Sequence, residues 1–171
     1  KLAQHVQPHH QAGRTGPLVF VTVRHRFSSD AGVALEEEQD LVYREPPAPN
    51  ARSTDETLDA KGADGATWQR TIHPTETLLF RYSALTFNGH RIHYDRRYAE
   101  EVEGYAGLVV HGPLIATLLL DLAQTQLPAE RVERFEFKAM RPTFVTSDFS
   151  VCGAPDADDQ LRLWSTDNRG A

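Results

Sequence analysis

The sequence predicts an α+β fold in which antiparallel strands surround one buried helix, and three observations support this prediction. Residues 104–120 contain no Asp, Glu, Lys or Arg. This uncharged run includes the first half of an apolar helix expected over residues 114–126. Residues 17–27 alternate as a strand does, with valine at every second position on one face. Turn signals at Pro142 and Pro155 divide the apolar segments after the helix. A helix this apolar is enclosed on most sides, so we expect strands to wrap around it.

Composition and charge limit the classes of protein to consider. The chain has 171 residues, of which 40% are hydrophobic and 25% are charged, and a net charge of −6. These values predict one globular domain or two small ones, and the lack of a basic stripe excludes a general nucleic-acid binder. The single cysteine, Cys152, excludes an intrachain disulfide and fits a reducing compartment. The first residues lack a secretory signal and the apolar run is interrupted by Gly and Pro. We therefore expect no membrane partner and a cytoplasmic location, or an organelle matrix if the source is eukaryotic.

The first third of the chain predicts strands followed by a linker. Residues 1–15 hold three histidines and predict a mobile polar end, with a metal site as the alternative. Strands are expected over residues 17–27 and 36–44, and two strands cannot bury a core alone. Residues 46–67 are rich in Pro, Ala, Asp and Gly, which predicts an exposed linker.

The remaining residues predict a domain with its own core. We expect a strand over residues 76–86, an irregular loop over residues 87–113, and then the buried helix. Three further strands are expected in the segments that turn residues separate, which are residues 131–140, 144–152 and 161–166. One buried helix wrapped by an antiparallel sheet is the arrangement of the hotdog fold.

Two segments concentrate residues with useful chemistry. The first, residues 86–95, contains two histidines, an amide and a carboxylate, and histidine is the side chain best suited to exchange protons near neutral pH. The second, residues 107–114, opens the buried helix with Gly112 and Pro113. The free N–H groups at such a helix start can hold a carbonyl oxygen that gains negative charge. Together the two segments predict proton abstraction next to a carbonyl group.

These two segments resemble the MaoC-like, or type 2, enoyl-thioester hydratases. Within that group they look most like the branch of mesaconyl-C4-CoA hydratase and the mitochondrial-type 3-hydroxyacyl-thioester dehydratases. By this resemblance His93 matches the catalytic histidine and Asp95 the aspartate that follows it. Asn88 stands where the catalytic aspartate belongs, His90 stands where the family asparagine belongs, and Arg91 replaces a proline.

The resemblance implies a function and a set of site residues. We expect a hydro-lyase that acts reversibly on enoyl- or 3-hydroxyacyl-thioesters, with a mesaconyl-CoA-like or short acyl substrate. It implies His93, Asn88 and His90 as catalytic residues. Four residues are implied in substrate binding, of which the first three match the helix-start motif: Val110, His111, Gly112 and Asp95. No metal and no bound cofactor are expected, because CoA or a carrier-bound pantetheine belongs to the substrate.

The resemblance also implies an organisation in which two hotdogs pair. We expect residues 1–45 to be the last strands of a non-catalytic amino-terminal hotdog and residues 68–171 to be the catalytic one. The chain then looks like part of a longer protein that forms a homodimer or a double-hotdog assembly. The strands of residues 17–44 are expected to extend the second sheet into one continuous antiparallel sheet, within the chain or across a dimer.

Several alternatives remain open at this point. Zinc could gather His90, His93, Asp95 and His111. A non-catalytic acyl-CoA-binding module or a hotdog thioesterase could use the same groove. Structural roles are also available: Asn88 could form an Asx turn, Asp95 could cap a short helix at residues 96–102, Gly112 could allow close packing, and His111 could orient the loop.

Overall fold

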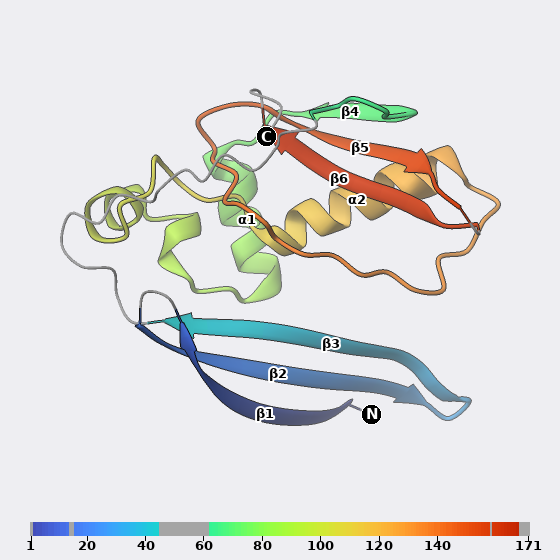
Figure 1. Ribbon diagram of the computed structural model, residues 1–171, viewed down its shortest axis with the longest axis horizontal. Helices are drawn as coiled ribbons and strands as arrows, with labels where there is room; N and C mark the ends of the chain where they lie inside the picture. The colour runs from blue at the N-terminus through green and yellow to red at the C-terminus, as the bar shows by residue number, and fades with distance from the viewer. Residues whose placement is uncertain (1, 14–15, 45–61, 158, 168–171) are drawn as a thin grey trace. The chain divides into compact units, whose positions relative to one another are not determined.

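The computed structural model describes residues 2–13, 16–44, 62–157 and 159–167. The chain divides into two compact units, residues 1–49 and residues 50–171, and each is described by itself. We call them the amino-terminal unit and the carboxy-terminal unit. Figure 1 shows the strands of the first in blue, and the helices and strands of the second in green to red.

The amino-terminal unit is a three-stranded antiparallel sheet. Its strands are β1 (Leu2–Gly13), β2 (Gly16–Ser29) and β3 (Gly32–Arg44), and their order in the sheet is β1-β2-β3. Gly32 has a φ of 116° in the turn between β2 and β3, a conformation that favours glycine. The strands expected over residues 17–27 and 36–44 are confirmed, and both are longer than predicted.

The prediction of a mobile polar end at residues 1–15 is wrong for the residues that the structure describes. Leu2–Gly13 pairs with β2 along its whole length, from Leu2 opposite Phe27 to Gly13 opposite Gly16. Backbone N–H and C=O groups make these bonds, so a strand of polar side chains can still form where a partner strand lies beside it. Pro8 fits because β1 is an edge strand of this sheet.

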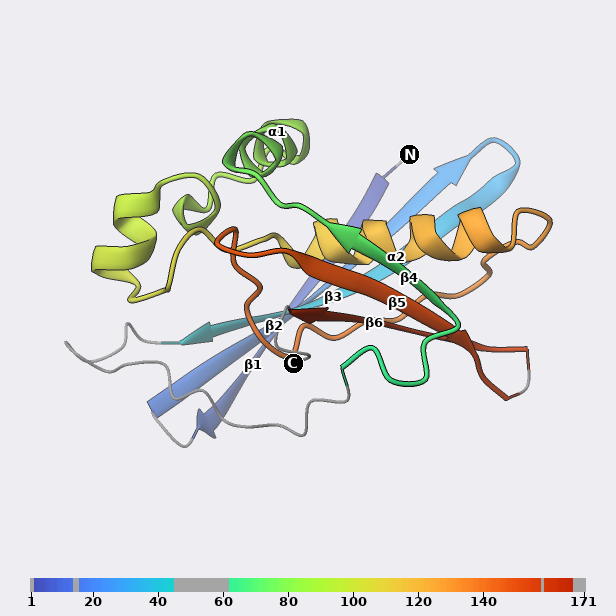
Figure 2. The ribbon, with the colours of Figure 1, turned by 90° about the horizontal axis from the view of Figure 1, so that it is seen from above.

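The carboxy-terminal unit packs a three-stranded sheet against one long helix. The strands are β4 (Trp68–Ile72), β5 (Phe149–Pro155) and β6 (Leu161–Asp167), antiparallel in the order β4-β5-β6. Helix α2 (Gly112–Gln126) contacts all three strands, and Figure 2 shows the three strands side by side with β4 passing over the helix. The α+β class and the hotdog fold are therefore confirmed, and the helix begins two residues earlier than expected.

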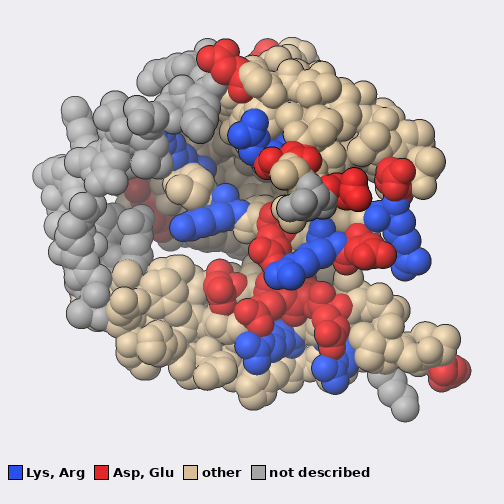
Figure 3. All heavy atoms as spheres, turned by 45° about the vertical axis from the view of Figure 1, so that its right-hand side comes forward, with Lys and Arg blue, Asp and Glu red and all other residues tan. Residues whose placement is uncertain are grey.

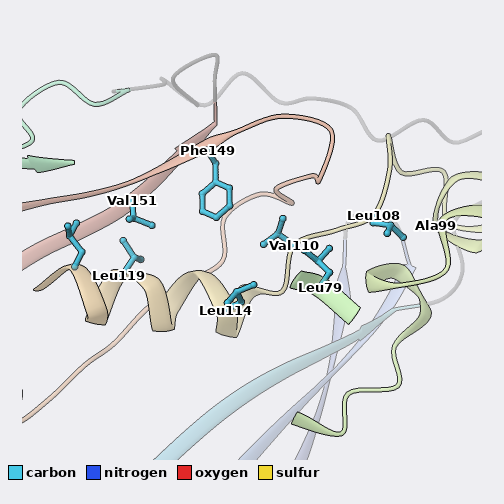
Figure 4. Packing of buried hydrophobic residues seen from close by; sticks show 9 residues of the cluster. Leu79, Ala99, Leu108, Val110, Leu114, Leu119, Phe149 and Val151 are labelled. Carbon is cyan, nitrogen blue, oxygen red and sulfur yellow. The ribbon is translucent and has the colours of Figure 1, made fainter. Parts of the chain in front are cut away.

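The core of this unit lies between α2 and β5. Figure 4 shows Phe149 and Val151 pointing from β5 toward Leu114 and Leu119 on α2. Val151 is fully buried, and α2 turns Asp121 outward, where it pairs with Arg70. Burial of a side chain of this size contributes roughly 1.5–3 kcal/mol, so this layer of residues fixes the start of α2 against the sheet.

The strand predicted over residues 76–86 is wrong, because Glu76–Thr86 is the helix α1. The Thr75 hydroxyl accepts a hydrogen bond from the Leu78 N–H at 3.1 Å, which caps the helix start. Leu79 and Ser83, four residues apart, form the buried face. Alternating apolar residues in this segment mimic a strand, whereas the cap and the spacing of the buried pair favour the helix.

Other predictions around the sheet need correction. Residues 131–140 form no strand, and Val132 and Phe137 are exposed. Val132 and Phe135 are three residues apart, so in a strand their side chains would point to opposite faces. The strand predicted over residues 144–152 begins only at Phe149, whereas the one at residues 161–166 is confirmed as β6. β4 was not predicted.

The linker expected over residues 46–67 lies largely outside the described residues. Its last part is held to the sheet: the Thr67 N–H donates to the Gly153 carbonyl at 2.9 Å, and the Trp164 indole donates to the Gly62 carbonyl at 2.9 Å. Each sheet belongs to its own unit. The expectation that residues 17–44 extend the second sheet into one continuous antiparallel sheet, within the chain or across a dimer, stays a prediction.

Charged side chains of both signs are interspersed on the surface. Figure 3 shows Lys and Arg beside Asp and Glu over the face that it displays. In the amino-terminal unit Arg24 pairs with Glu38, and Arg26 pairs with Glu36 across β2 and β3. None of the helices that the structure describes is both long and apolar enough to span a membrane.

Candidate active site

His93 is held in a defined tautomer. It ends the short 3-10 helix Arg91–His93 and is 7% exposed. Its Nδ1 lies 2.7 Å from the Val109 carbonyl oxygen. A carbonyl can only accept, so Nδ1 carries the proton and Nε2 of the neutral ring keeps its lone pair. This geometry leaves Nε2 as the atom that can take a proton.

Burial keeps the His93 ring neutral at physiological pH. Removal from water lowers the pKa of His93 below its ordinary value, because the charged ring loses hydration. The hydrogen bond to Val109 opposes this shift, and the nearby His90 adds to it. A neutral imidazole with a free Nε2 is the form that a general base requires.

His111 lies directly against His93 and immediately precedes α2. The two rings stack with their centroids 3.7 Å apart and an interplanar angle of 17°. His111 is fully buried, and its Nε2 lies 2.8 Å from the hydroxyl oxygen of Ser83. Burial lowers the pKa of His111 to about 4, with His93 as a second cause, so this ring is neutral as well. The predicted His111 therefore joins the site as a buried neighbour of His93.

Ser83 was missed in the sequence analysis. It lies on α1, is buried, and comes one turn after Leu79 on the same face. The segment had been predicted as a strand, which left no reason to single out this serine. A prediction of a helix that starts at the Thr75 cap would have placed Ser83 on the buried face, together with Leu79.

Asn88 and His90 form the loop that covers His93. The Asn88 side-chain oxygen accepts the His90 N–H at 3.0 Å, which is the Asx turn weighed above. The Asn88 N–H donates to the Ser83 carbonyl at 2.9 Å and so ends α1. His90 is exposed, and its ring meets His93 edge-on at 5.6 Å. The Tyr94 hydroxyl donates to the Gly89 carbonyl at 2.8 Å and holds the loop from its other side.

Gly112 is the first residue of α2, two residues before the predicted start of the helix. Its N–H finds no acceptor among the described residues, as is usual in a first helical turn. A Cβ added at Gly112 would meet the Ala139 Cβ at 3.9 Å, an ordinary contact, so close packing does not require glycine here. Pro113 brings no N–H of its own. The helix start thus offers a free N–H, beside the stacked histidines, to an oxygen that gains charge.

Asp95 and Val110, which were also predicted in the site, have hydrogen-bond partners within the chain. Asp95 accepts the Tyr98 N–H at 3.0 Å as a helix cap, and its other oxygen binds Arg91. This guanidinium, together with the Tyr98 N–H, lowers the pKa of Asp95. Val110 is 2% exposed in the core and its N–H donates to Thr143 at 2.7 Å. Both residues therefore have structural partners within the chain, and their expected part in substrate binding stays a prediction.

The alternative of a zinc site lacks support in the described part of the chain. No group of three or more His, Cys, Asp or Glu side chains is placed there to hold a metal ion. Nδ1 of His93 is hydrogen-bonded to Val109, and Nε2 of His111 is hydrogen-bonded to Ser83. The Asp95 carboxylate is bound to Arg91. The arrangement is instead suited to move a proton between Nε2 of His93 and a substrate atom.

Solved structures identify the class of fold. The chain is similar to a MaoC-like dehydratase from Phytophthora capsici, with a TM-score of 0.63 and 13% identity over 99% of this chain and 61% of that one. It is also similar to the peroxisomal multifunctional enzyme type 2 from Drosophila melanogaster, with a TM-score of 0.65 and 12% identity over 98% of this chain and 31% of that one. At such low identity these likenesses show the fold alone, which is the MaoC-like hotdog.

Sequence comparison identifies the family. The family model described as hydroxyacyl-thioester dehydratase type 2 matches residues 3–145, and the chain belongs to this family. It is 47% identical to mesaconyl-C(4)-CoA hydratase of Chloroflexus aurantiacus, over 86% of this chain and 51% of the relative. It is 32% identical to the mitochondrial hydroxyacyl-thioester dehydratase type 2 of Schizosaccharomyces pombe, over 82% of this chain and 46% of the relative. The chain spans about half the length of these curated relatives.

Proposed function

We propose that the protein containing this chain is a hydro-lyase that reversibly hydrates enoyl-thioesters and dehydrates 3-hydroxyacyl-thioesters. The observation that carries this proposal is the hydrogen bond from His93 Nδ1–H to the Val109 carbonyl, which leaves Nε2 as a base. The stack on His111 puts this base next to the start of α2, where the Gly112 N–H is free. Family membership and the 47% identical hydratase support the same reaction type.

The mechanism uses one proton carrier and one oxyanion donor. In dehydration the carbonyl oxygen of the thioester accepts a hydrogen bond from the Gly112 N–H. His93 Nε2 then removes a proton from C2 as the C2–H bond breaks. Charge moves onto the thioester oxygen, where the helix start stabilises it. The C3–O bond then breaks, the C2=C3 double bond forms, and the imidazolium of His93 protonates the departing hydroxyl to give water. Hydration is the reverse, so protons and electrons balance in both directions.

Asn88 and His90 assist in this proposal without acting as the base. An amide has no proton-accepting nitrogen near neutral pH, so Asn88 cannot replace the family aspartate as a base. Its Asx turn positions His90 against the edge of His93. We assign these two residues to holding the water or the substrate hydroxyl near Nε2. Asp95 and Val110 have no part in the proposed step.

The substrate and setting are proposed from the relatives. A mesaconyl-like acyl group on CoA is suggested by the name of the matched hydratase, and we extend the proposal to short acyl groups and to carrier pantetheine. The reaction needs no bound cofactor, because the thioester itself stabilises the charge at C2. We further propose a homodimer or a double-hotdog assembly in the cytoplasm or an organelle matrix. The Schizosaccharomyces pombe relative is mitochondrial by name.

A thioester panel on the full-length protein tests the reaction. Crotonyl-CoA, mesaconyl-CoA and 3-hydroxybutyryl-CoA are incubated separately, and water addition and free thiol are measured on the same samples. We expect loss of the conjugated double bond of crotonyl-CoA and mesaconyl-CoA, and appearance of one from 3-hydroxybutyryl-CoA, in each case without thiol release. Thiol release would indicate a thioesterase, and thioester binding without turnover would indicate an acyl-CoA-binding module.

Replacement of His93 tests the residue that carries the proposal. His93→Ala should lower kcat/KM at least about 100-fold, as expected for loss of a positioned acid–base group. His93→Gln should be equally inactive, although its amide can still donate to the Val109 carbonyl and limit the damage to folding. The matched control is His25→Ala, at a histidine of the amino-terminal unit that pairs with Glu37, which should keep activity within about twofold. Activity of a folded His93→Gln within threefold of the parent would remove His93 from the proposed step.

A further inference from the structure

The orientation of His93 is restrained by more than its hydrogen bond. The bond from Nδ1 to the Val109 oxygen fixes one ring nitrogen, yet the ring could still turn about the line joining these two atoms. The His111 ring, 3.7 Å away and within 17° of parallel, removes that freedom. The direction in which Nε2 points therefore depends on where His111 lies.

His111 is itself anchored by α1. The Ser83 hydroxyl lies 2.8 Å from His111 Nε2, and both side chains are buried. The Tyr82 ring meets His111 edge-on at 4.9 Å. Ser83 is held through its own helix, because Leu79 is fully buried one turn earlier. A chain of contacts thus runs from the core through Ser83 and His111 to His93.

Packing alone does not explain a histidine at this position. Nδ1 of His111 is buried and has no hydrogen-bond partner among the described residues, which costs free energy that an apolar side chain would avoid. A neutral imidazole can stack on His93 before and after His93 takes a proton, whereas a charged ring would repel the imidazolium. Burial keeps the pKa of His111 near 4 and so keeps its ring neutral.

We propose that Ser83 and His111 are a buried pair of positioning residues that fixes the ring plane of His93 and aims its Nε2 at the substrate. This inference rests on the proposed function. Neither residue touches substrate: Ser83 acts through His111, and His111 acts through the stack. Loss of the Ser83 hydroxyl frees His111 to tilt, and His93 then spends less time in the reactive orientation. The effect falls on kcat rather than on substrate binding.

Replacement of Ser83 in the full-length protein tests the pair. Ser83→Ala should lower kcat about 10-fold and leave KM within about twofold. Ser83→Thr retains the hydroxyl and should restore kcat to within about threefold of the parent. Thr125→Ala is the matched control, because it also removes a helical hydroxyl, one that donates to the Asp121 carbonyl on the exposed side of α2. That variant should keep both constants. If Ser83→Ala does not fold, Ser83→Cys keeps the volume with a weaker hydrogen bond and takes its place.

A spectroscopic readout separates this inference from the proposed function. Long-range ¹H–¹⁵N NMR spectra report which nitrogen of each imidazole carries the proton. In the parent His93 should be the Nδ1–H tautomer alone, and in Ser83→Ala a mixture of tautomers should appear. Unchanged kcat and an unchanged His93 tautomer in folded Ser83→Ala would overturn the positioning role, as would a loss of kcat that Ser83→Thr does not restore. A parent protein without hydratase activity would overturn the proposed function, while the tautomer shift would still report on the pair.

Discussion

The two units of the chain use the same antiparallel pairing but differ in what lies on their faces. In the amino-terminal unit, Val23 is the one buried apolar side chain among the described residues, and Leu2, Phe27 and Leu35 lie exposed in a row across the three strands. In the carboxy-terminal unit, α2 covers one face of the sheet and encloses a core. Among the described residues, therefore, only those of the second unit form a site where water is excluded from a polar side chain.

The surroundings of two histidines, one in each unit, differ in the same way. His25 pairs through Nδ1 with the exposed carboxylate of Glu37. His93 pairs through Nδ1 with a buried backbone carbonyl and lies under a second imidazole. A carbonyl adds no charge to the site, and burial removes water, so His93 stays neutral and available for proton transfer. The enclosed core is thus what turns an ordinary histidine into a candidate base.

The largest difference between the units should appear when a charge is placed in each sheet. Val151→Asp puts a carboxylate at a fully buried position of β5 and should lower the free energy of unfolding by more than about 4 kcal/mol. Val42→Asp, at a position of β3 that is 55% exposed, is the matched control and should change it by less than about 0.5 kcal/mol. Chemical denaturation of the full-length protein, with amide exchange to locate the effect, measures both. Similar losses in the two variants would remove the contrast between the units.

Acidification should weaken the carboxy-terminal unit specifically. Burial lowers the pKa of His111 to about 4, whereas the unfolded residue titrates near 6.5. Above about pH 6.5 the ring is neutral in both states and its contribution to stability is complete. As the pH falls from 6.5 toward 4, His111 binds a proton in the unfolded chain but not in the folded protein. The free energy of unfolding therefore drops by up to about 1.4 kcal/mol per pH unit.

This pH dependence is measured by denaturation at several pH values between 7.5 and 4.5. His111→Gln has no titrating ring and should show a shallower slope, even if its stability at neutral pH is lower. Thr125→Ala removes no titrating group and should keep the slope of the parent. An identical slope in His111→Gln and the parent would show that this ring is not the group responsible.

Strong periodicity made some elements predictable from the sequence, and weak periodicity hid others. β2, β6 and α2 follow from clear alternation or from an apolar run. α1 was mistaken for a strand because Leu78, Phe80 and Tyr82 alternate, while its helical form depends on the Thr75 cap and on tertiary packing of Leu79. Half of the residues in β1 are polar, and the strand has no alternation of apolar residues from which its pairing with β2 could be predicted.

The site was predictable where a short motif carries it and not where distant segments meet. His93, His90 and Gly112 were found because each lies in a local run of unusual residues. The tautomer of His93 depends on a carbonyl 16 residues away, and the bond of Ser83 to His111 spans 28 residues. Such contacts are set by packing between α1 and the start of α2, which no local pattern encodes.

Removal of the α1 cap should have a moderate effect that reaches the site. Thr75→Ala removes the acceptor for the Leu78 N–H and should cost about 1 kcal/mol of stability. Because α1 carries Ser83, fraying at its start should also loosen the contact with His111. Amide exchange along α1 should therefore quicken, while that of β2 and β3 should stay as in the parent. Thr75→Ser keeps the cap and is the control; an effect as large as that of the alanine variant would mean that the hydroxyl is not what stabilises the helix.

The smallest effect is expected from the ion pairs of the amino-terminal sheet. Arg24 and Glu38 are both more than half exposed, and solvent and salt screen their attraction. In a double-mutant cycle Arg24→Gln and Glu38→Gln should be additive within error, and any coupling at low salt should vanish at high salt. The buried pair Ser83 and His111, tested in the same way with Ser83→Ala and His111→Gln, should be clearly non-additive, because each change removes the same contact. A large, salt-resistant coupling between Arg24 and Glu38 would mean that cross-strand charges, rather than backbone pairing, hold the amino-terminal sheet together.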